Sequence, residues 1–210
     1  MNSTFELKGL YAITDSTLAA NSSIIDQVAQ ALAGGARVIQ YRDKSGDDQK
    51  RLAEAGALLT LCRQHHAPLI INDDVELAAR IGADGVHLGK DDPDIEAARA
   101  RLGKQAIIGI SCYNQFERAF IAQEAGADYI AFGRFFNSTV KPDAVQAQPD
   151  LLRRAKRELK LPMVAIGGIT PENGGALIEA GADMLAVIHG VFGQPDIRAA
   201  CERFNELFRQ

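Results

Sequence analysis

The chain has 210 residues, a formal net charge of -4, and 47% apolar against 24% charged residues. This balance is that of a folded globular protein and excludes disordered and fibrous classes. The acidic net charge also argues against a nucleic-acid-binding protein, which would carry a basic surplus. The length suits one domain, so we expect residues 1–210 to form a single catalytic domain.

Short apolar runs alternate with longer amphipathic runs along the whole chain. The short runs lack strict alternation of apolar and polar residues, which is typical of parallel strands covered on both faces. The predicted strands, in chain order, are Leu10–Asp15, Arg37–Asp43, Pro68–Asp73, Gly85–Gly89, Ala106–Ser111, Asp128–Phe135, Pro162–Gly168 and Met184–Phe192. The intervening stretches carry apolar residues at helical spacing, as in Asp48–His66 and Pro195–Arg209.

A weak internal repeat supports this organisation. Its copies begin at Gly34, Ile81, Ala125 and Ala180, and in each a glycine is expected to end a helix in the left-handed conformation before a strand begins. Each interval holds two strand–helix units, so the chain contains eight. We therefore predict an α/β fold, a single (β/α)8 TIM barrel. The alternative, a doubly wound open sheet, would carry a glycine-rich GxGxxG fingerprint after the first strand, where this chain has Thr14-Asp15-Ser16-Thr17.

Polar residues gather at the carboxyl ends of the predicted strands, which meet at the mouth of a barrel and carry its chemistry. Gln40, Arg42 and Lys44 have period two at the end of the second strand. They share one face if that strand continues so far. Two cations at the mouth predict a site for an anion more highly charged than a monophosphate.

The seventh and eighth strands end in Gly167-Gly168 and Ile188-His189-Gly190. Small residues let backbone N–H groups approach phosphate oxygens, so we predict a phosphate site at these two turns. The alternative is a pair of tight turns without a ligand. For His189 we favour a ligand contact. His87 lies between Val86 and Leu88, so a hydrogen-bonded core histidine and a site residue are equally compatible with the sequence.

Pairs of aspartates follow the third and fourth strands, as Asp73-Asp74 and Asp91-Asp92. Carboxylate oxygens are the ligands that Mg²⁺ prefers, together with substrate phosphates, so we predict that Asp73 and Asp92 bind Mg²⁺. Helix N-capping is the alternative, and it suits Asp74 and one residue of the second pair. Capping explains one aspartate in each pair but not both.

Three cysteines, Cys62, Cys112 and Cys201, are widely separated and form no CxxC pair. Buried or half-buried thiols in a reducing cytoplasm are the expected state. No signal peptide or membrane-spanning run is predicted, so we expect a cytoplasmic protein without a membrane or nucleic-acid partner. The sequence leaves a homo-oligomer open.

The segments at these strand ends resemble those of the thiamine phosphate synthase family, also called thiamine-phosphate pyrophosphorylases. The most specific are Gln40-Tyr41-Arg42-Asp43-Lys44, Ile71-Asn72-Asp73-Asp74, Gly85-Val86-His87-Leu88-Gly89, Phe132-Gly133-Arg134-Phe135-Phe136-Asn137-Ser138 and Ala165-Ile166-Gly167-Gly168-Ile169-Thr170. The resemblance runs from Tyr11 to Phe192. It implies a (β/α)8 enzyme that joins two small-molecule substrates, 4-amino-5-hydroxymethyl-2-methylpyrimidine pyrophosphate and 4-methyl-5-(2-phosphoethyl)-thiazole.

The resemblance also implies roles for individual residues. The matching positions hold the pyrimidine pyrophosphate at Gln40, Arg42, Lys44, Asn72, Ser111 and Lys141. They hold the thiazole phosphate at Ser138, Thr139, Val140, Gly168, Ile188 and His189, and Mg²⁺ at Asp73 and Asp92. We expect Arg42, Lys44, Lys141 and Ser111 to act in catalysis.

The chemistry implied by the resemblance is a dissociative displacement that needs no protein nucleophile. No Ser-His-Asp or Cys-His arrangement is evident in the sequence, which agrees with this expectation. Two alternatives stay open: a thiazole phosphate tautomerase, which would need only the thiazole site, and a non-catalytic sensor of thiamine intermediates. The joint presence of Arg42, Lys44, Asn72, Asp73 and Asp92 argues against the tautomerase.

Overall fold

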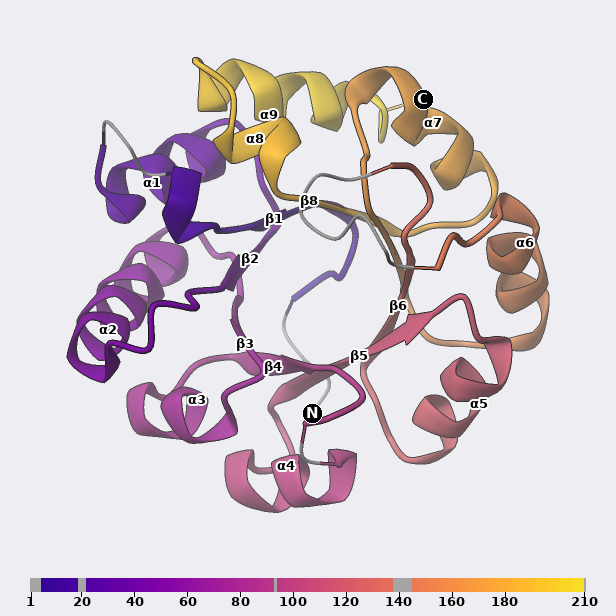
Figure 1. The fold of residues 1–210 in the computed structure, drawn as a ribbon, viewed down its shortest axis with the longest axis horizontal. Coiled ribbons are helices and arrows are strands. Elements are labelled where there is room, and N and C mark those ends of the chain that lie inside the picture. Colours follow the sequence, from indigo (N-terminus) through magenta and orange to yellow (C-terminus); the bar gives the residue numbers. More distant parts are fainter. Residues whose placement is uncertain (1–4, 19–21, 93, 138–144, 210) are drawn as a thin grey trace.

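The computed structural model describes residues 5–18, 22–92, 94–137 and 145–209. Its strands form a closed barrel in the order β1-β2-β3-β4-β5-β6-β7-β8, with every neighbouring pair parallel. The helices form a ring around the strands (Figure 1). The predicted single (β/α)8 barrel is therefore confirmed. In the described ranges, no helix is long and apolar enough to cross a membrane.

The strands are short and almost entirely buried, as expected for a parallel sheet with helices on one face and a packed interior on the other. They span Gly9–Ile13 (β1), Val38–Tyr41 (β2), Leu69–Asn72 (β3), Gly85–Leu88 (β4), Ile107–Tyr113 (β5), Tyr129–Gly133 (β6), Met163–Ile166 (β7) and Met184–Val187 (β8).

The helices between them have the capping residues that the sequence offers. They span Ser16–Leu18 (η1, a 3-10 helix), Ile24–Ala33 (α1), Asp48–Gln64 (α2), Val75–Ile81 (α3), Ile95–Leu102 (α4), Phe116–Glu124 (α5), Pro149–Glu158 (α6), Pro171–Glu179 (α7), His189–Phe192 (α8) and Ile197–Glu206 (α9). Ser23, Asp47, Asp74, Asp94 and Asp196 each accept a hydrogen bond from the backbone of the first turn that follows. These caps satisfy donors that a helix start otherwise leaves without partners.

Two apolar clusters hold the barrel together. A large one, including Leu10, Ala12 and Ile39, lies between the strands and the helices. A smaller one, including Tyr11 and Tyr129, fills the inside of the barrel. Successive residues of β1 belong alternately to the two clusters because neighbouring side chains of a strand point to opposite faces. The interior cluster is the floor on which the mouth of the barrel is built.

The internal repeat has the predicted local structure. Gly35, Gly82, Gly126 and Gly181 all have positive φ, between 67° and 117°, directly after the helices that precede β2, β4, β6 and β8. Three copies also carry an aspartate whose side chain accepts a hydrogen bond from a backbone N–H at the start of the preceding strand. Asp84 accepts from Leu69, Asp128 from Ile108 and Asp183 from Met163. The fourth copy has Arg37 at this position.

Most strand ends differ from the sequence prediction by one or two residues, and three differences matter most. The eighth strand ends at Val187, and residues predicted to continue it form α8, because the turn at Ile188 starts a short helix. The fifth strand runs beyond Ser111 to Tyr113 through an irregularity in its pairing with β6. The cap of α4 is Asp94, so capping by Asp91 or Asp92 was wrong, whereas the predicted cap Asp74 is confirmed.

The three cysteines are free and buried, as predicted. Burial raises the pKa of each thiol to about 12, so Cys62, Cys112 and Cys201 stay protonated at neutral pH. A protonated, buried thiol is a poor nucleophile. These residues therefore serve the packing of the outer cluster.

Candidate functional site

A cavity of about 440 Å³ opens at the carboxyl ends of the strands. Its lining combines apolar residues of the barrel interior, such as Tyr11 and Val164, with polar residues from the strand ends. Seven of the residues predicted to bind a substrate line it: Gln40, Arg42, Asn72, Ser111, Gly168, Ile188 and His189. A mostly apolar cavity with few convergent polar groups is the usual form of a small-molecule site.

The floor of this cavity is a chain of hydrogen bonds that crosses the barrel from β2 to β5. The buried Gln40 donates through Nε2 to Tyr11 Oη over 2.8 Å, and Tyr11 Oη lies 2.7 Å from Tyr129 Oη. His87 Nδ1 lies 3.0 Å from Tyr129 Oη, and His87 Nε2 lies 2.8 Å from Ser111 Oγ. We call Gln40, Tyr11, Tyr129, His87 and Ser111 the floor chain. Burial raises the pKa of both tyrosines, so their hydroxyls remain protonated.

His87 is both a hydrogen-bonded core histidine and a residue of the cavity, the two roles that the sequence left open. Its imidazole is hydrogen-bonded at both nitrogens and stacks on the Tyr129 ring, with 5.6 Å between centroids. It also lines the cavity. The inward position in β4 explains this double role because an inward side chain near the strand's end reaches the cavity from below.

Arg42 lies just beyond β2 and is held from two sides. Its backbone N–H donates to Thr14 Oγ1 over 2.9 Å, and Thr14 Oγ1 donates back to the Arg42 carbonyl. Its guanidinium lies 3.7 Å from the Asp15 carboxylate at the end of β1. The guanidinium is only partly screened by this pair because its side chain stays 18% exposed at the cavity. Arg42 can therefore bind an anion without a large movement.

Lys44 occupies a neighbouring hollow rather than the cavity itself. A groove of about 660 Å³ is lined by Lys44, Arg51 and Arg101 together with Asp73 and Asp74. Asn72 lines both the groove and the cavity, so the two hollows adjoin at the end of β3. The condition set for Gln40, Arg42 and Lys44 to share one strand face is not met, because β2 ends at Tyr41. The chain turns outward after Arg42, and the charge of Lys44 faces Asp73 instead.

Asp73 and Asp92 come together beside this groove. Asp73 has φ of 63°, a left-handed conformation that aspartate tolerates better than most residues. Its carboxylate accepts a hydrogen bond of 2.6 Å from Asn72 Nδ2. Asp92 accepts 2.5 Å from the Gly89 N–H. Burial, followed by the charge of Asp92 and a hydrogen bond with it, raises the pKa of Asp73 above its ordinary value. Two carboxyl groups this close repel each other when ionised, and a cation between them would remove that repulsion.

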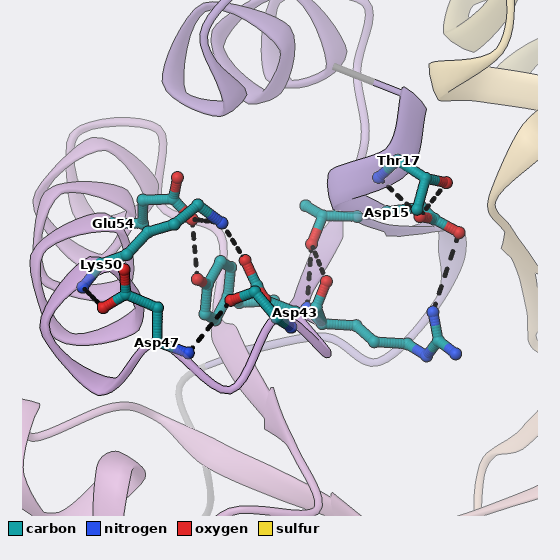
Figure 2. A network of polar contacts seen from close by, with 10 residues as sticks. Asp15, Thr17, Asp43, Asp47, Lys50 and Glu54 are labelled. Atoms are coloured by element: carbon teal, nitrogen blue, oxygen red, sulfur yellow. Dashed lines mark hydrogen bonds and ion pairs between the residues drawn. The ribbon is translucent and has the colours of Figure 1, made fainter. Parts of the chain in front are cut away.

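The turn that carries Lys44 is anchored to α2. Figure 2 shows Lys50 of α2 directed at Asp43, with Glu54 beside Lys50 and Asp47 close by. Lys50 Nζ pairs with Asp43 and lies 3.3 Å from Glu54, and Tyr41 Oη donates to Glu54 over 2.8 Å. Asp43 therefore points away from the cavity, between two residues that face the two hollows.

The opposite end of the cavity is formed by the turns after β7 and β8, as predicted. Gly168 has φ of 64°, and a Cβ there would lie 2.3 Å from the Asn137 carbonyl oxygen. Only glycine fits this close approach. His189 starts α8, and the cavity wall continues through Ile188 and Gly190 to Gln194. Backbone at this end is close enough to the cavity to meet a phosphate group.

Four predicted residues, Ser138, Thr139, Val140 and Lys141, lie outside the described residues. Within the described ranges, no group of three or more His, Cys, Asp and Glu side chains is placed to hold a metal ion. Asp73 and Asp92 are a pair, and a pair suffices only where a ligand supplies the remaining oxygens.

The sequence interpretation missed Tyr11, Tyr129 and Asp15. Both tyrosines lie at inward strand positions, where a hydroxyl must find a partner once it is buried. That requirement was a readable signal for the floor chain. The pairing of Asp15 with Arg42 needed the register of β1 on β2, in which Ile13 lies opposite Gln40.

Comparison with known proteins identifies the family of this chain. The family described as "Thiamine monophosphate synthase" matches residues 10–191. The thiamine-phosphate synthase of Nitrosococcus oceani is 55% identical over 202 residues, which cover 96% of this chain and 93% of that protein. That of Nitrosospira multiformis is 49% identical over 205 residues, covering 98% and 87%.

A solved structure shows the same arrangement in three dimensions. The thiamine phosphate pyrophosphorylase from Pyrococcus furiosus superposes with a TM-score of 0.88 at 35% identity, covering 97% of this chain and 96% of that one. The fold and the near full-length similarity agree. The chain belongs to the thiamine-phosphate synthase family of enzymes.

Proposed function

We propose that this chain condenses 4-amino-5-hydroxymethyl-2-methylpyrimidine pyrophosphate with 4-methyl-5-(2-phosphoethyl)-thiazole, giving thiamine phosphate and pyrophosphate. The observation that carries the proposal is one cavity, bounded by Gln40, Arg42 and Ser111 at one end and by Gly168 and His189 at the other, next to a charged groove. Two substrates with one anionic group each need such a paired site.

The aspartate pair fits a magnesium ion. Asp73 and Asp92 offer hard oxygen donors, and Asp73 is held in a half-buried position where its own charge is unfavourable. Mg²⁺ held by these two carboxylates would neutralise charge on the pyrophosphate oxygens. Asn72 keeps the Asp73 carboxylate in place through its side-chain amide.

The side chains around the pyrophosphate stabilise a leaving group. The C–O bond between the pyrimidinylmethyl carbon and pyrophosphate breaks with both electrons leaving on oxygen. Arg42 from the cavity side and Lys44 from the groove side then face the oxygens that gain charge, and Lys141 belongs to the same set. The thiazole nitrogen attacks the resulting pyrimidinylmethyl cation. Apolar walls exclude water, which would otherwise capture this cation.

Electrostatics gives the scale of this assistance. One cation–oxyanion contact at 4 Å is worth up to about 4 kcal/mol at an effective dielectric constant near 20, before desolvation is subtracted. Only the part that grows as the bond breaks accelerates the reaction, because the remainder also binds the substrate's ground state. Catalysis therefore lies in positioning and in charge stabilisation.

A single assay tests the proposal. Purified protein is incubated with both phosphorylated halves and Mg²⁺, and thiamine phosphate is detected as a fluorescent thiochrome after oxidation. Product that depends on Mg²⁺ is the expected result. Absence of product would overturn the proposal. Conversion of a thiazole phosphate tautomer in the same preparation would then support the tautomerase, and binding without turnover would support a sensor.

A further inference from the structure

The contacts of the floor chain allow a proton order that runs from Gln40 to Ser111, and the tautomer of His87 distinguishes it from the reverse order. Gln40 Nε2 can only donate, so Tyr11 Oη accepts at that contact. The proton of Tyr11 then goes to Tyr129 Oη, and the proton of Tyr129 goes to His87 Nδ1. An imidazole that accepts at Nδ1 carries its proton on Nε2, where it donates to Ser111 Oγ. Ser111 keeps its own hydroxyl proton for another acceptor.

We infer that Tyr11, Tyr129 and His87 are positioning residues that set the hydrogen-bond polarity of the cavity floor. At one end Gln40 uses Nε2 for Tyr11, which leaves its carbonyl oxygen Oε1 as the acceptor for a ligand. At the other end Ser111 offers a hydroxyl donor. Both end residues line the cavity, and between them Tyr11 and Tyr129 are buried, at 1% and 0% exposed. The buried members therefore decide what the two end residues present.

The ligand that fits this polarity is a nitrogen heterocycle that carries an amino group and a ring nitrogen. The amino N–H is a donor for Gln40, and a ring nitrogen is an acceptor for Ser111. This assignment rests on the proposed function, in which the pyrimidine carries both groups. As the C–O bond breaks, the amino group gains positive charge, and a carbonyl dipole facing it stabilises that charge. A reversed amide would present N–H groups to the same position and oppose it.

The inference makes an unusual prediction for the two tyrosines. In Tyr129→Phe, the Tyr11 hydroxyl loses its acceptor, and the nearest remaining acceptor is the Gln40 carbonyl oxygen. The amide then turns, and its N–H groups face the ligand. In Tyr11→Phe, Gln40 is left free to turn toward whichever partner the ligand offers. Tyr129→Phe should therefore be the more harmful change, and adding Tyr11→Phe to it should partly restore function.

The tautomer of His87 gives a test that does not depend on activity. Nitrogen-15 NMR of the histidines, with His87 assigned by its absence in His87→Gln, should show the proton on Nε2 in the wild type. Tyr129→Phe should shift the signals toward a mixture of tautomers. The control is Tyr41→Phe, which removes the hydroxyl of another buried tyrosine, one that donates to Glu54 on the outer side of β2. It should leave the signals unchanged. A wild-type His87 with its proton on Nδ1, or no shift in Tyr129→Phe, would overturn the inference.

Ligand selectivity gives the second test. Calorimetry compares the aminopyrimidine pyrophosphate with the same compound carrying a methyl group in place of the amino group. The ratio of their dissociation constants should fall about tenfold in Tyr129→Phe, the equivalent of one hydrogen bond, and recover partly in the double variant. A merely structural role predicts a double variant worse than either single one, and that result would contradict the inference.

The two proposals fail separately. If the wild type binds the pyrimidine but makes no thiamine phosphate, the proposed function is wrong, and the tautomer and the selectivity ratio still decide on the floor chain. If the wild type binds neither compound, the tautomer alone decides.

Discussion

Asp43 lies between Arg42 and Lys44, and it lines the groove while its carboxylate pairs with Lys50 of α2. Its side chain is fully covered, and it pairs with Lys50 and accepts from the Ser45 backbone over 2.6 Å. Burial alone would raise the pKa of Asp43, but the contacts with Lys50 and Ser45 outweigh it and lower the pKa to about 2. Asp43 thereby ties the turn after β2 to α2 and fixes where its two neighbours emerge.

This pairing makes a prediction for the pH dependence of stability. A carboxyl group with a lowered pKa in the folded state stabilises the protein above its unfolded pKa, near 4, and this contribution disappears as the pH falls toward about 2. The contribution amounts to at most about 2 kcal/mol at neutral pH. Urea unfolding followed between these pH values should show the loss in the wild type and a weaker one in Asp43→Asn. Equal pH profiles of the two proteins would contradict the assignment.

Asp73 and Asp92 give a prediction for activity. Asp73→Ala and Asp92→Ala should each lower kcat/KM by about a hundredfold or more, since each removes a carboxylate proposed to hold the metal. Both variants should remain folded, which circular dichroism can check. Asp91→Ala is the matched control because Asp91 is exposed and adjacent in sequence. Near-normal turnover by the Asp73 and Asp92 variants would sink the metal assignment.

At the level of elements, β2 shows where a sequence pattern stops being reliable. Period two correctly put Gln40 and Arg42 on one cavity, but it failed at Lys44. The strand ends at Tyr41 because the Arg42 N–H bonds to the Thr14 side chain rather than continuing the ladder. The period-two pattern of residues 40–44 cannot indicate a hydrogen bond to Thr14, which lies nearly thirty residues earlier in the chain. The position of these residues at the strand ends was readable from the sequence, while their division between two hollows was not.

The turn after β7 depends on the absence of a side chain. Gly168→Ala places a Cβ against the Asn137 carbonyl oxygen in a left-handed conformation, so the turn must shift. We expect KM for the thiazole phosphate to rise at least several-fold, with a smaller effect on the pyrimidine substrate. Steady-state kinetics with each substrate varied in turn measures this difference.

The control for that change lies in α7. Gly175 has open space around its Cα, so Gly175→Ala should stabilise the protein by up to about 1 kcal/mol and leave both KM values unchanged. If Gly168→Ala leaves both KM values unchanged, as expected for Gly175→Ala, the proposal that the turn after β7 binds the thiazole phosphate is wrong.

At the level of the whole molecule, the internal repeat both ends helices and links neighbouring strands of the barrel. Its glycines predicted where helices end, and that much was readable from local backbone rules. The aspartates that follow them accept backbone N–H groups near the start of the neighbouring strand. These bonds join residues 15 to 20 positions apart, so they depend on the closed register of the barrel. They lie at the end of the barrel opposite the cavity, so the residues that stabilise the fold there are separate from the residues of the candidate site.

Asp128 tests this separation. It accepts from the Ile108 N–H over 2.8 Å and pairs with Arg99 over 2.7 Å. Asp128→Ala leaves the Ile108 N–H without its partner and should lower the free energy of unfolding by about 1–3 kcal/mol. The kcat should stay within about twofold of the wild type. Asp150→Ala, which removes an exposed pair with Arg153, should change stability by less than about 1 kcal/mol. A large fall in kcat for Asp128→Ala would show that the two ends are coupled.

Closure of the sheet has a consequence for the order in which the protein is made. The first strand finds one of its two neighbours only when β8 emerges, because Leu10 pairs with Leu185 and the Asn205 side chain of α9 reaches the Gly34 carbonyl of α1. Until then, a growing chain on the ribosome has two strand edges without partners, and such edges recruit other chains. The nascent protein is therefore at greatest risk of aggregation during the last stage of its synthesis, and a chaperone that shields β1 would be most useful then.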